Sequence, residues 1–462
     1  MAKKSDVSVC GIELRFLPVE TRIPLKFGPE TTHGVTCARV CVTVAGGCGA
    51  PVAGWGETPL SVAWLWPSDT PPSQRDERLR DFCRLIARAL AGFPECGHPM
   101  EISRIFITDI LPDLLTESNR RHPDDPIPLL AALACFSPFD IALHDAYAKR
   151  ACVFVYDIYG PAFMNHDLSW YYRDDHGQEF RDKYPDDFLI RRPRKTLRAW
   201  HLVGGHDLLG EEELTGDEPN DGYPVVLTDW ITRDGLTALK IKLFGKDPDW
   251  DYQRLVRVGE IAAAMKVEWL CADFNCCVED PRQIVDALTR LSVEKPVLYK
   301  MLAYVEQPFP RDLHANPLDV RAVASLKPLF MDESAHDWEH VEFGRTLGWT
   351  GVALKTCKTQ TGALLSLCWA RMKGMDIMVQ DLTNPMLAQI PHVLLAAYAG
   401  SGMGVETNAM QFYPAASLPE AAVHPGLYSR RSGQVDFSAL GKIGFGYHLE
   451  KIRRELPPAE KY

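Results

Sequence analysis

The sequence lacks several features that would identify a class of protein directly. No apolar run has the roughly 20 residues of a membrane-spanning helix, so no membrane segment is expected. The first residues, MAKKSDVSVCGIELRF, contain no apolar stretch of the signal-peptide kind, so secretion is not expected. No glycine-rich phosphate motif follows a predicted strand, which argues against a dinucleotide site. A soluble protein without a nucleotide cofactor is therefore favoured.

Cysteine and charge exclude further classes. The 13 cysteines are odd in number and scattered, and their spacing resembles neither a zinc site nor a disulfide framework. This favours a reducing, cytoplasmic location. The formal charge of −11 argues against a nucleic-acid partner. With 462 residues, of which 46% are hydrophobic and 24% charged, the chain is long enough for two globular domains.

The first part of the chain predicts a small sheet followed by helices. The stretches CGIELRFLPVETRIPLKFG, VTCARVCVTVAGG and VAGWGETPL are rich in strand-forming residues and bounded by glycines. Helical periodicity follows in RDERLRDFCRLIARALAGF and again over residues 128–152. Residues 1–160 are therefore predicted to form an α+β domain.

The second part predicts a barrel. From about residue 229, short apolar strands alternate with helical stretches, which implies a parallel sheet. About 240 residues of this pattern favour a closed barrel over residues 161–410, with an open doubly wound sheet as the alternative. We expect the first strand at LSWYY, residues 168–172, followed by a polar insertion near 170–225. Residues 411–462 form a separate C-terminal segment.

Two lysines in LKIKLF, residues 239–244, are unusual for a buried strand. Lys240 and Lys242 are two residues apart and therefore share one face of the strand. In a barrel this face points inward, where ammonium groups are costly unless acids pair with them. An exposed edge strand with solvated lysines is the alternative.

Acidic residues end the next three predicted strands. They are Asp273 with Asn275, then Glu306, then Asp332 with Glu333. Active sites of such barrels lie at the carboxyl ends of the strands. Three carboxylates placed together repel one another unless a cation lies between them, and oxygen ligands favour Mg²⁺. Each acid taken alone is also a plausible helix cap.

Lys355 ends the following strand and is expected to face the lysine pair across the barrel. Lys358, three residues later, is expected to be solvated. A lysine on each side of a metal-bound carboxylate suits abstraction of the α-proton through an enediolate intermediate. A lysine acts as a base near neutral pH only if its pKa is lowered by burial and neighbouring cations.

The ordered set KIK, DFN, VEQP, MDES and LKTCK resembles the enolase superfamily, and within it the muconate lactonizing enzyme subgroup. GWGET and FDIALHDAYAKRACVFVYDIYG resemble its capping domain. The resemblance implies an α+β capping domain plus an α/β modified TIM barrel of the (β/α)7β type, with 411–462 returning to the capping domain. The mandelate racemase subgroup, which has a histidine base on its seventh strand, fits poorly.

The resemblance also implies roles for individual residues. Asp273, Glu306 and Asp332 would be the Mg²⁺ ligands, with Asn275 and Glu333 near the metal. Lys242 and Lys355 would be the acid/base pair, and Lys240 a supporting cation. Gln380 and Asp381 end the seventh strand, where many relatives show a glutamate. Asn408 stands near the place of the Asp-x-Asp motif that dipeptide epimerases use, which puts a dipeptide substrate in doubt.

The favoured function is Mg²⁺-dependent racemisation, epimerisation or cycloisomerisation of a small carboxylate. An acid-sugar dehydratase or a non-catalytic binding protein on this fold is the alternative, and a Schiff-base aldolase is disfavoured by the three acids. The resemblance implies a homo-oligomer. A covering loop over residues 21–34 and the stretch 57–67 would close the site. Trp64 and Trp66 would line a substrate pocket or pack the domain interface.

Overall fold

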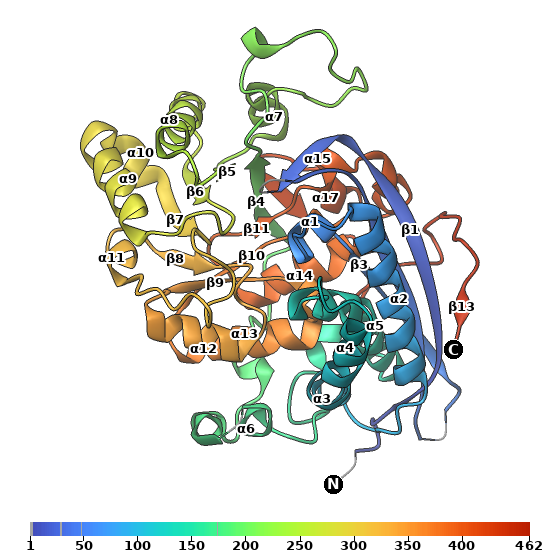
Figure 1. The fold of residues 1–462 in the computed structure, drawn as a ribbon. Helices are drawn as coiled ribbons and strands as arrows, with labels where there is room; N and C mark the ends of the chain where they lie inside the picture. Colours follow the sequence, from blue (N-terminus) through green and yellow to red (C-terminus); the bar gives the residue numbers. More distant parts are fainter. Residues whose placement is uncertain (1–2, 28–29, 48, 173) are drawn as a thin grey trace.

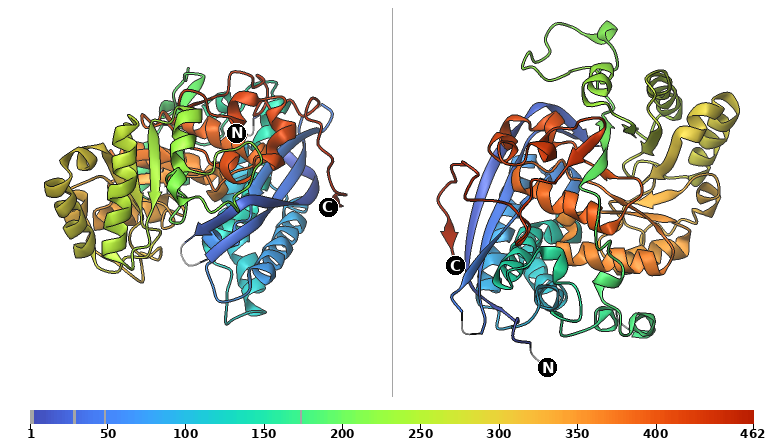
Figure 2. Two further views of the ribbon diagram at one scale, coloured as in Figure 1. Left: turned by 90° about the horizontal axis from the view of Figure 1, so that it is seen from above. Right: turned by 180° about the vertical axis from the view of Figure 1, so that it is seen from behind.

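Two sheets organise the chain (Figure 1). The computed structural model describes residues 3–27, 30–47, 49–172 and 174–462. The first sheet is antiparallel, in the order β13-β1-β2-β3. Its strands are β1 (Ser8–Phe27), β2 (Glu30–Ala45), β3 (Val52–Pro59) and β13 (Glu460–Lys461). The predicted α+β capping domain is therefore confirmed, and the C-terminal strand β13 completes its sheet (Figure 2).

Helices cover one side of the antiparallel sheet. They are α1 (Val62–Leu65), α2 (Pro72–Ala91), α3 (Pro99–Ile105), α4 (Leu111–Arg120) and α5 (Leu129–Arg150). Close packing of α5 on β3 explains the glycines of GWGET. A Cβ at Gly56 would lie 2.1 Å from the carbonyl oxygen of Pro138, and one at Gly54 would lie 2.1 Å from the nitrogen of Ala146. Only glycine allows this approach of backbone to backbone.

Helix α5 also resembles a membrane span in length and composition. It has 22 residues and a mean hydropathy of 1.3, and it alone among the helices of the described ranges passes this test. In the structure, 94% of its apolar window is buried by the capping domain and the barrel. The helix predicted over residues 128–152 is thus a core helix of the fold, although its length and composition also suit a membrane span.

Eight parallel strands close the second sheet into a barrel. They are β4 (Thr196–Val203), β5 (Ala238–Lys242), β6 (Trp269–Asp273), β7 (Leu302–Glu306), β8 (Leu329–Met331), β9 (Gly351–Leu354), β10 (Asp376–Val379) and β11 (Val405–Glu406). Closure is direct, because Val405 of β11 pairs with Ala199 of β4. The closed barrel is confirmed, and the open doubly wound sheet is excluded.

Seven helical crossovers join these strands, as the (β/α)7β type requires. The helices are α7 (Leu227–Asp234), α8 (Pro248–Ala264), α9 (Pro281–Glu294), α10 (Pro296–Met301), α11 (Arg321–Ala324), α12 (Trp338–Leu347), α13 (Gln360–Met372) and α14 (Gln389–Ala399). Large side chains fill the lower barrel interior, among them Trp200, Tyr304 and Phe330. The polar residues of the interior are consequently confined to the carboxyl ends of the strands.

The first barrel strand was predicted in the wrong place. Residues Leu168–Tyr171 form the short helix α6, whose first turn is capped by Asp167 through the backbone N–H of Ser169. The first strand is β4, which lies inside the range assigned to the insertion. The irregular sequence is therefore divided into one segment before β4 and another, residues 204–226, after it.

The covering segment is a hairpin rather than a loop. β1 and β2 stay paired as far as Phe27 and Glu30, while residues 28 and 29 lie outside the described ranges. The Glu30 carboxylate accepts hydrogen bonds of 3.0 and 2.6 Å from Arg75 of α2. Ion pairing thus fixes the end of the hairpin to the capping domain.

After β11 the chain returns over the capping domain. This segment contains α15 (Ala409–Phe412), α16 (Leu418–Ala421), α17 (Pro425–Tyr428) and β12 (Gln434–Asp436), which pairs antiparallel with β4. A buried cluster joins it to the first sheet. Arg39 of β2 contacts Glu57 of β3 and lies 3.3 Å from Glu420 of α16, and Glu420 also pairs with Arg454 at 2.5 Å.

Replacing Arg39 with methionine is expected to lower the free energy of unfolding by about 3–5 kcal/mol, because the buried Glu57 carboxylate loses its cationic partner. Urea denaturation measures this. Arg80→Ala is the matched control, since its pair with Asp76 on α2 is partly exposed and contributes about 1 kcal/mol or less. Equal stability losses in the two variants would contradict the assignment.

Candidate active site

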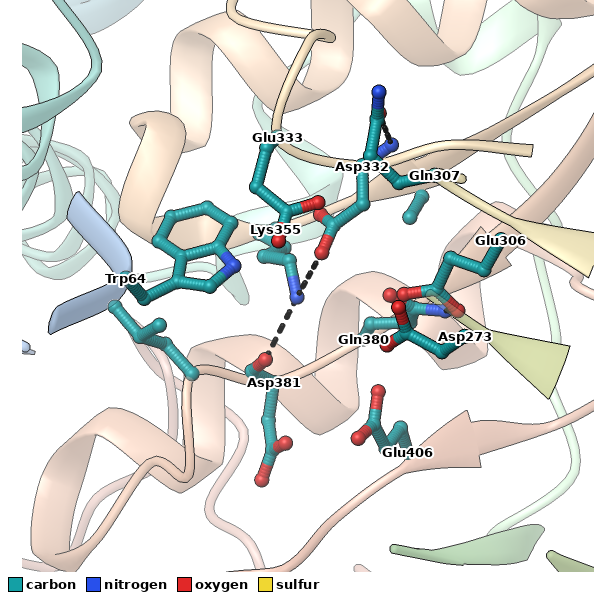
Figure 3. A network of polar contacts seen from close by, with 12 residues as sticks. Trp64, Asp273, Glu306, Gln307, Asp332, Glu333, Lys355, Gln380, Asp381 and Glu406 are labelled. Atoms are coloured by element: carbon teal, nitrogen blue, oxygen red, sulfur yellow. Dashed lines mark hydrogen bonds and ion pairs between the residues drawn. The ribbon is translucent and has the colours of Figure 1, made fainter. Parts of the chain in front are cut away.

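Polar side chains from seven successive strands meet at the carboxyl end of the barrel. Lys240 and Lys242 come from β5, Asp273 from β6 and Glu306 from β7. The strands are in register, because Lys242 pairs with Asp273 and Asp273 with Glu306. Asp332, Lys355, Gln380 and Glu406 continue the ring from β8 to β11. Several of these side chains point into one space in Figure 3.

Lys240 lies among the acids and is 2% exposed. Its Nζ is 2.5 Å from Glu306 Oε1, 3.1 Å from both Asp273 Oδ2 and Glu406 Oε2, and 3.3 Å from Gln380 Oε1. Burial alone lowers the pKa of Lys240, but the carboxylates of Glu306 and its neighbours raise it well above the usual value. Lys240 is therefore a fixed positive charge.

Asp273 is the last residue of β6, and Asn275 lies two residues beyond it. Asp273 Oδ2 is 2.5 Å from Lys242 Nζ, and its Oδ1 accepts from the backbone N–H of Asn275 at 3.0 Å. Burial raises the pKa of Asp273, yet Lys242 and Lys240 hold it well below the usual range. The Asn275 amide donates to Glu333 Oε1 at 3.3 Å, which links the ends of β6 and β8.

Glu306 is a buried carboxyl group whose surroundings disfavour its ionised form. Burial and the nearby Asp273 carboxylate raise its pKa to about 8, against the opposing effect of Lys240. Gln380 donates to Glu306 Oε2 and, at 3.2 Å, to the hydroxyl of Tyr304. Gln380 thus orients the carboxylate from the opposite part of the barrel.

Lys355 stands between Asp332 and Asp381 (Figure 3). Its Nζ is 3.2 Å from Asp332 Oδ2 and donates to the backbone oxygen of Asp381 at 2.9 Å. Burial lowers the pKa of Lys355, but the Asp332 carboxylate outweighs this and raises the pKa above its usual value, so the lowered pKa expected of a base is not found for Lys355. The ring of Trp64 lies 5.1 Å from the ammonium, so the capping domain covers this lysine with an aromatic face.

The prediction that Lys358 is solvated is wrong. The residue is 4% exposed, and its Nζ donates to the backbone oxygen of Asp332 at 2.5 Å and lies 3.4 Å from Asp332 Oδ1. Burial lowers its pKa. The turn after β9 directs the side chain back into the barrel, which strand periodicity could not show.

Asp381 and Asn408 lie beside the cluster and bind each other. The Asp381 carboxylate accepts from the backbone N–H of Asn408 at 2.9 Å and from its amide at 3.2 Å. The same amide donates to Glu406 Oε1 at 2.8 Å, and Asn408 Oδ1 accepts from the N–H of Leu202 at 3.0 Å. Asn408 therefore ties β11 to β4.

Two site residues were missed in the sequence. Glu406 ends β11 in the stretch VETN, so the strand-end rule that found the other acids applies to it as well. Gln307 lies just beyond β7 and accepts at Oε1 from the backbone N–H of Asp332 at 2.7 Å and from the hydroxyl of Ser334 at 2.8 Å. Only tertiary contacts reveal Gln307. Trp66, by contrast, donates to Asp125 and lies away from the lysines.

The donor set fits a hard cation, although the carboxylates are not arranged around one. Among the residues of the described ranges, no three His, Cys, Asp or Glu side chains stand in metal-binding geometry. The ammonium groups of Lys240 and Lys242 lie among the acids instead. Glu333 Oε2 is buried and has no hydrogen-bond partner in the described part of the chain. Burial and the Asp332 carboxylate raise the pKa of Glu333. Such a surplus of buried carboxylate oxygens suits Mg²⁺.

A capping domain over a (β/α)7β barrel, with acids and lysines at the strand ends, defines a known class of fold. No known family profile and no curated protein matches the sequence. Solved structures do match over nearly the whole chain, and they include dipeptide epimerases, racemases and muconate lactonizing enzymes. The predicted resemblance to the enolase superfamily is thereby confirmed for the fold.

Three of these structures illustrate the similarity. The dipeptide epimerase from Enterococcus faecalis V583, complexed with Mg and the dipeptide L-Leu-L-Tyr, is 16% identical, with a TM-score of 0.61 and coverage of 95% of this chain and 99% of that chain. The N-succinyl Arg/Lys racemase from Bacillus cereus ATCC 14579 is 15% identical, with a TM-score of 0.64 and coverage of 98% and 100%. The muconate lactonizing enzyme from Pseudomonas fluorescens, complexed with muconolactone, is 16% identical, with a TM-score of 0.59 and coverage of 95% and 96%.

Proposed function

We propose that this protein is an isomerase that removes the proton α to the carboxylate of a small substrate, by racemisation, epimerisation or cycloisomerisation. The position of Lys242 and Lys355 supports this most strongly. They come from β5 and β9, which are four strands apart in a closed barrel of eight. Their ammonium groups therefore approach the carboxylate cluster from opposite sides.

Each lysine has a role that its surroundings support. A substrate α-carbon held between them loses its proton to one Nζ and receives a proton from the other, which inverts the centre. Lys240 is fixed as a cation by Glu306, Asp273 and Glu406, so it provides positive charge beside the substrate carboxylate. Trp64 covers Lys355 and excludes water from the site.

We further propose that Asp273, Glu306 and Asp332 hold Mg²⁺, with Asn275 and Glu333 beside it. Bound Mg²⁺ would supply positive charge for the carboxylate of the substrate as its α-proton leaves. The buried carboxylate surplus at Glu306 and Glu333 supports this.

We also propose a cytoplasmic location and assembly into a homo-oligomer. Cysteines in the described ranges are all free thiols, which supports a reducing compartment such as the cytoplasm. The proposed partner is a small carboxylate, and the solved dipeptide epimerase carries Mg and a dipeptide. A dipeptide fits less well, because the Asn408 amide is already engaged by Asp381 and Glu406. A homo-oligomer is proposed from the resemblance.

Incubation in D₂O with Mg²⁺ and pooled carboxylates tests the proposed function. The pool contains N-acylated amino acids, dipeptides, lactone-forming diacids and acid sugars. Mass spectrometry is expected to show a one-deuteron gain in one substrate class, which disappears with EDTA. Loss of water from an acid sugar would indicate a dehydratase instead. If no pooled carboxylate gains deuterium or loses water, and the protein also fails to bind Mg²⁺, the protein is non-catalytic.

A further inference from the structure

A cavity lies outside the barrel wall beside β4, and we call it the wall pocket. Its volume is about 260 Å³. Its lining includes Ile23 and Pro24 of the covering hairpin, His201 of β4, Leu208 of the segment 204–226, Trp230 of α7 and Gln411 of α15. Two of the polar side chains in this lining are almost completely buried, since His201 and Gln411 are each 2% exposed.

The wall pocket is separate from the carboxylate cluster. Residues alternate along a strand, so Trp200 and Leu202 share one face of β4 and His201 and Val203 share the other. Trp200 packs inside the barrel against Tyr304. His201 consequently points outward, where it lies 5.4 Å from the ring of Trp230. The barrel wall itself divides this pocket from the lysines.

The hydrogen bonds of the two polar residues fix their chemistry. Gln411 Nε2 donates to the backbone oxygen of Leu202 at 3.0 Å, and this obligate acceptor sets the orientation of the amide. The same Nε2 lies 3.2 Å from His201 Nε2, which must therefore accept. The proton of the imidazole is then on Nδ1, and burial keeps the ring neutral by lowering its pKa.

Two polar atoms remain without a partner. His201 Nδ1 and Gln411 Oε1 are buried and make no hydrogen bond with any residue that the structure describes. One is a donor and the other an acceptor, and an unsatisfied buried group of either kind is costly. The surrounding wall is largely apolar, with Ile23, Leu208 and Trp230 around the pair. This is the usual composition of a site for a small organic ligand.

Contacts between the hairpin and the segment 204–226 cover the wall pocket. Arg22 Nε is 2.5 Å from Asp221 Oδ2, and its two terminal nitrogens donate to the backbone oxygens of Pro224 and Tyr223 at 3.1 and 3.0 Å. This segment rises beside α7 in Figures 1 and 2. A ligand in the pocket would thus be held between β4 and the hairpin.

We propose that the wall pocket binds a small uncharged amide. Its carbonyl oxygen accepts from His201 Nδ1, and its N–H donates to Gln411 Oε1. An amide carries both an acceptor and a donor, which complement the unsatisfied donor and acceptor of this pair. Anions are disfavoured because Asp207 and Glu218 also line the pocket. This site is independent of the proposed isomerase activity.

Calorimetric titration with benzamide, and with benzoate as the charged analogue, tests the proposal. Benzamide is expected to bind saturably to the full chain, and benzoate about tenfold more weakly or worse, because a carboxylate cannot donate to Gln411. His201→Phe keeps the ring but removes the donor, and is expected to weaken benzamide binding about tenfold. Lys355→Met is expected to leave benzamide binding unchanged, since the barrel wall separates the wall pocket from Lys355.

A second variant keeps the test decisive if His201→Phe does not fold. Ile23→Trp fills the wall pocket from the half-buried hairpin without changing the His201–Gln411 pair, and is expected to abolish benzamide binding. Glu218→Gln, at the half-buried rim of the pocket, is the matched control and is expected to retain benzamide binding. Absence of saturable binding to the natural chain, binding that survives Ile23→Trp, or binding that is lost in Lys355→Met would each overturn the proposal.

Discussion

Replacing Lys355 with methionine is expected to lower the rate of α-proton exchange by about 10³-fold, because a positioned acid or base contributes roughly 10²–10⁴-fold to such a step. Methionine keeps the length of the side chain and removes the amine. The same loss is expected for Lys242→Met. Exchange into substrate carboxylates in D₂O, followed by mass spectrometry, measures both variants.

Stereochemistry distinguishes a two-lysine mechanism from general damage to the site. Each variant is expected to lose exchange with one enantiomer and keep part of the exchange with the other, because the remaining lysine still faces one side of the α-carbon. Lys373→Met is the matched control, since Lys373 pairs with Glu179 away from the barrel interior. Full activity of both Lys242→Met and Lys355→Met would contradict the proposed function.

The barrel cluster could be predicted in large part because its signals are local. Lys240 and Lys242 are placed on one face by the two-residue period of a strand, and Asp273, Glu306 and Asp332 are marked by the point where apolar strands end. Both rules need only neighbouring residues. The two rules therefore bring the acids and the lysines together without information on the register of the strands.

Two residues could not be placed from the sequence, because their positions depend on contacts distant in sequence or on irregular backbone. Lys358 follows a turn after β9, where strand periodicity no longer applies, and it returns to Asp332. Gln307 has a positive φ of 31° at the end of β7, which turns its side chain toward the backbone of Asp332. Neither conformation is encoded in a pattern of apolar residues.

The misplaced first strand has a compositional cause. TLRAWHLV, which forms β4, follows the basic run RRPRK and precedes a long polar stretch, so its short apolar alternation is easily overlooked. LSWYY is richer in aromatic residues, yet Asp167 caps it as a helix. Pairing with β5, β11 and β12 stabilises β4, and such tertiary pairing outweighs local propensity.

Removing divalent cations is expected to abolish α-proton exchange while leaving the chain folded. The loss is expected to reach about 10³-fold, because metal charge contributes several kcal/mol to such transition states. The fold should survive, since Lys240 and Lys242 already balance Asp273 and Glu306 in the absence of metal. Exchange assays and far-ultraviolet circular dichroism, before and after EDTA, measure the two effects separately.

Added Mg²⁺ is expected to stabilise the natural chain by about 2.7 kcal/mol at a free concentration 100 times its Kd, because only the folded state holds the acids together. Glu306→Gln is expected to remove this stabilisation, since it deletes one proposed ligand from the cluster. Glu339→Gln is the matched control, because Glu339 is exposed on the first turn of α12. Thermal melting with and without Mg²⁺ gives the comparison. An equal Mg²⁺ effect in Glu306→Gln and in the natural chain would place the cation elsewhere and remove the proposed role of this carboxylate.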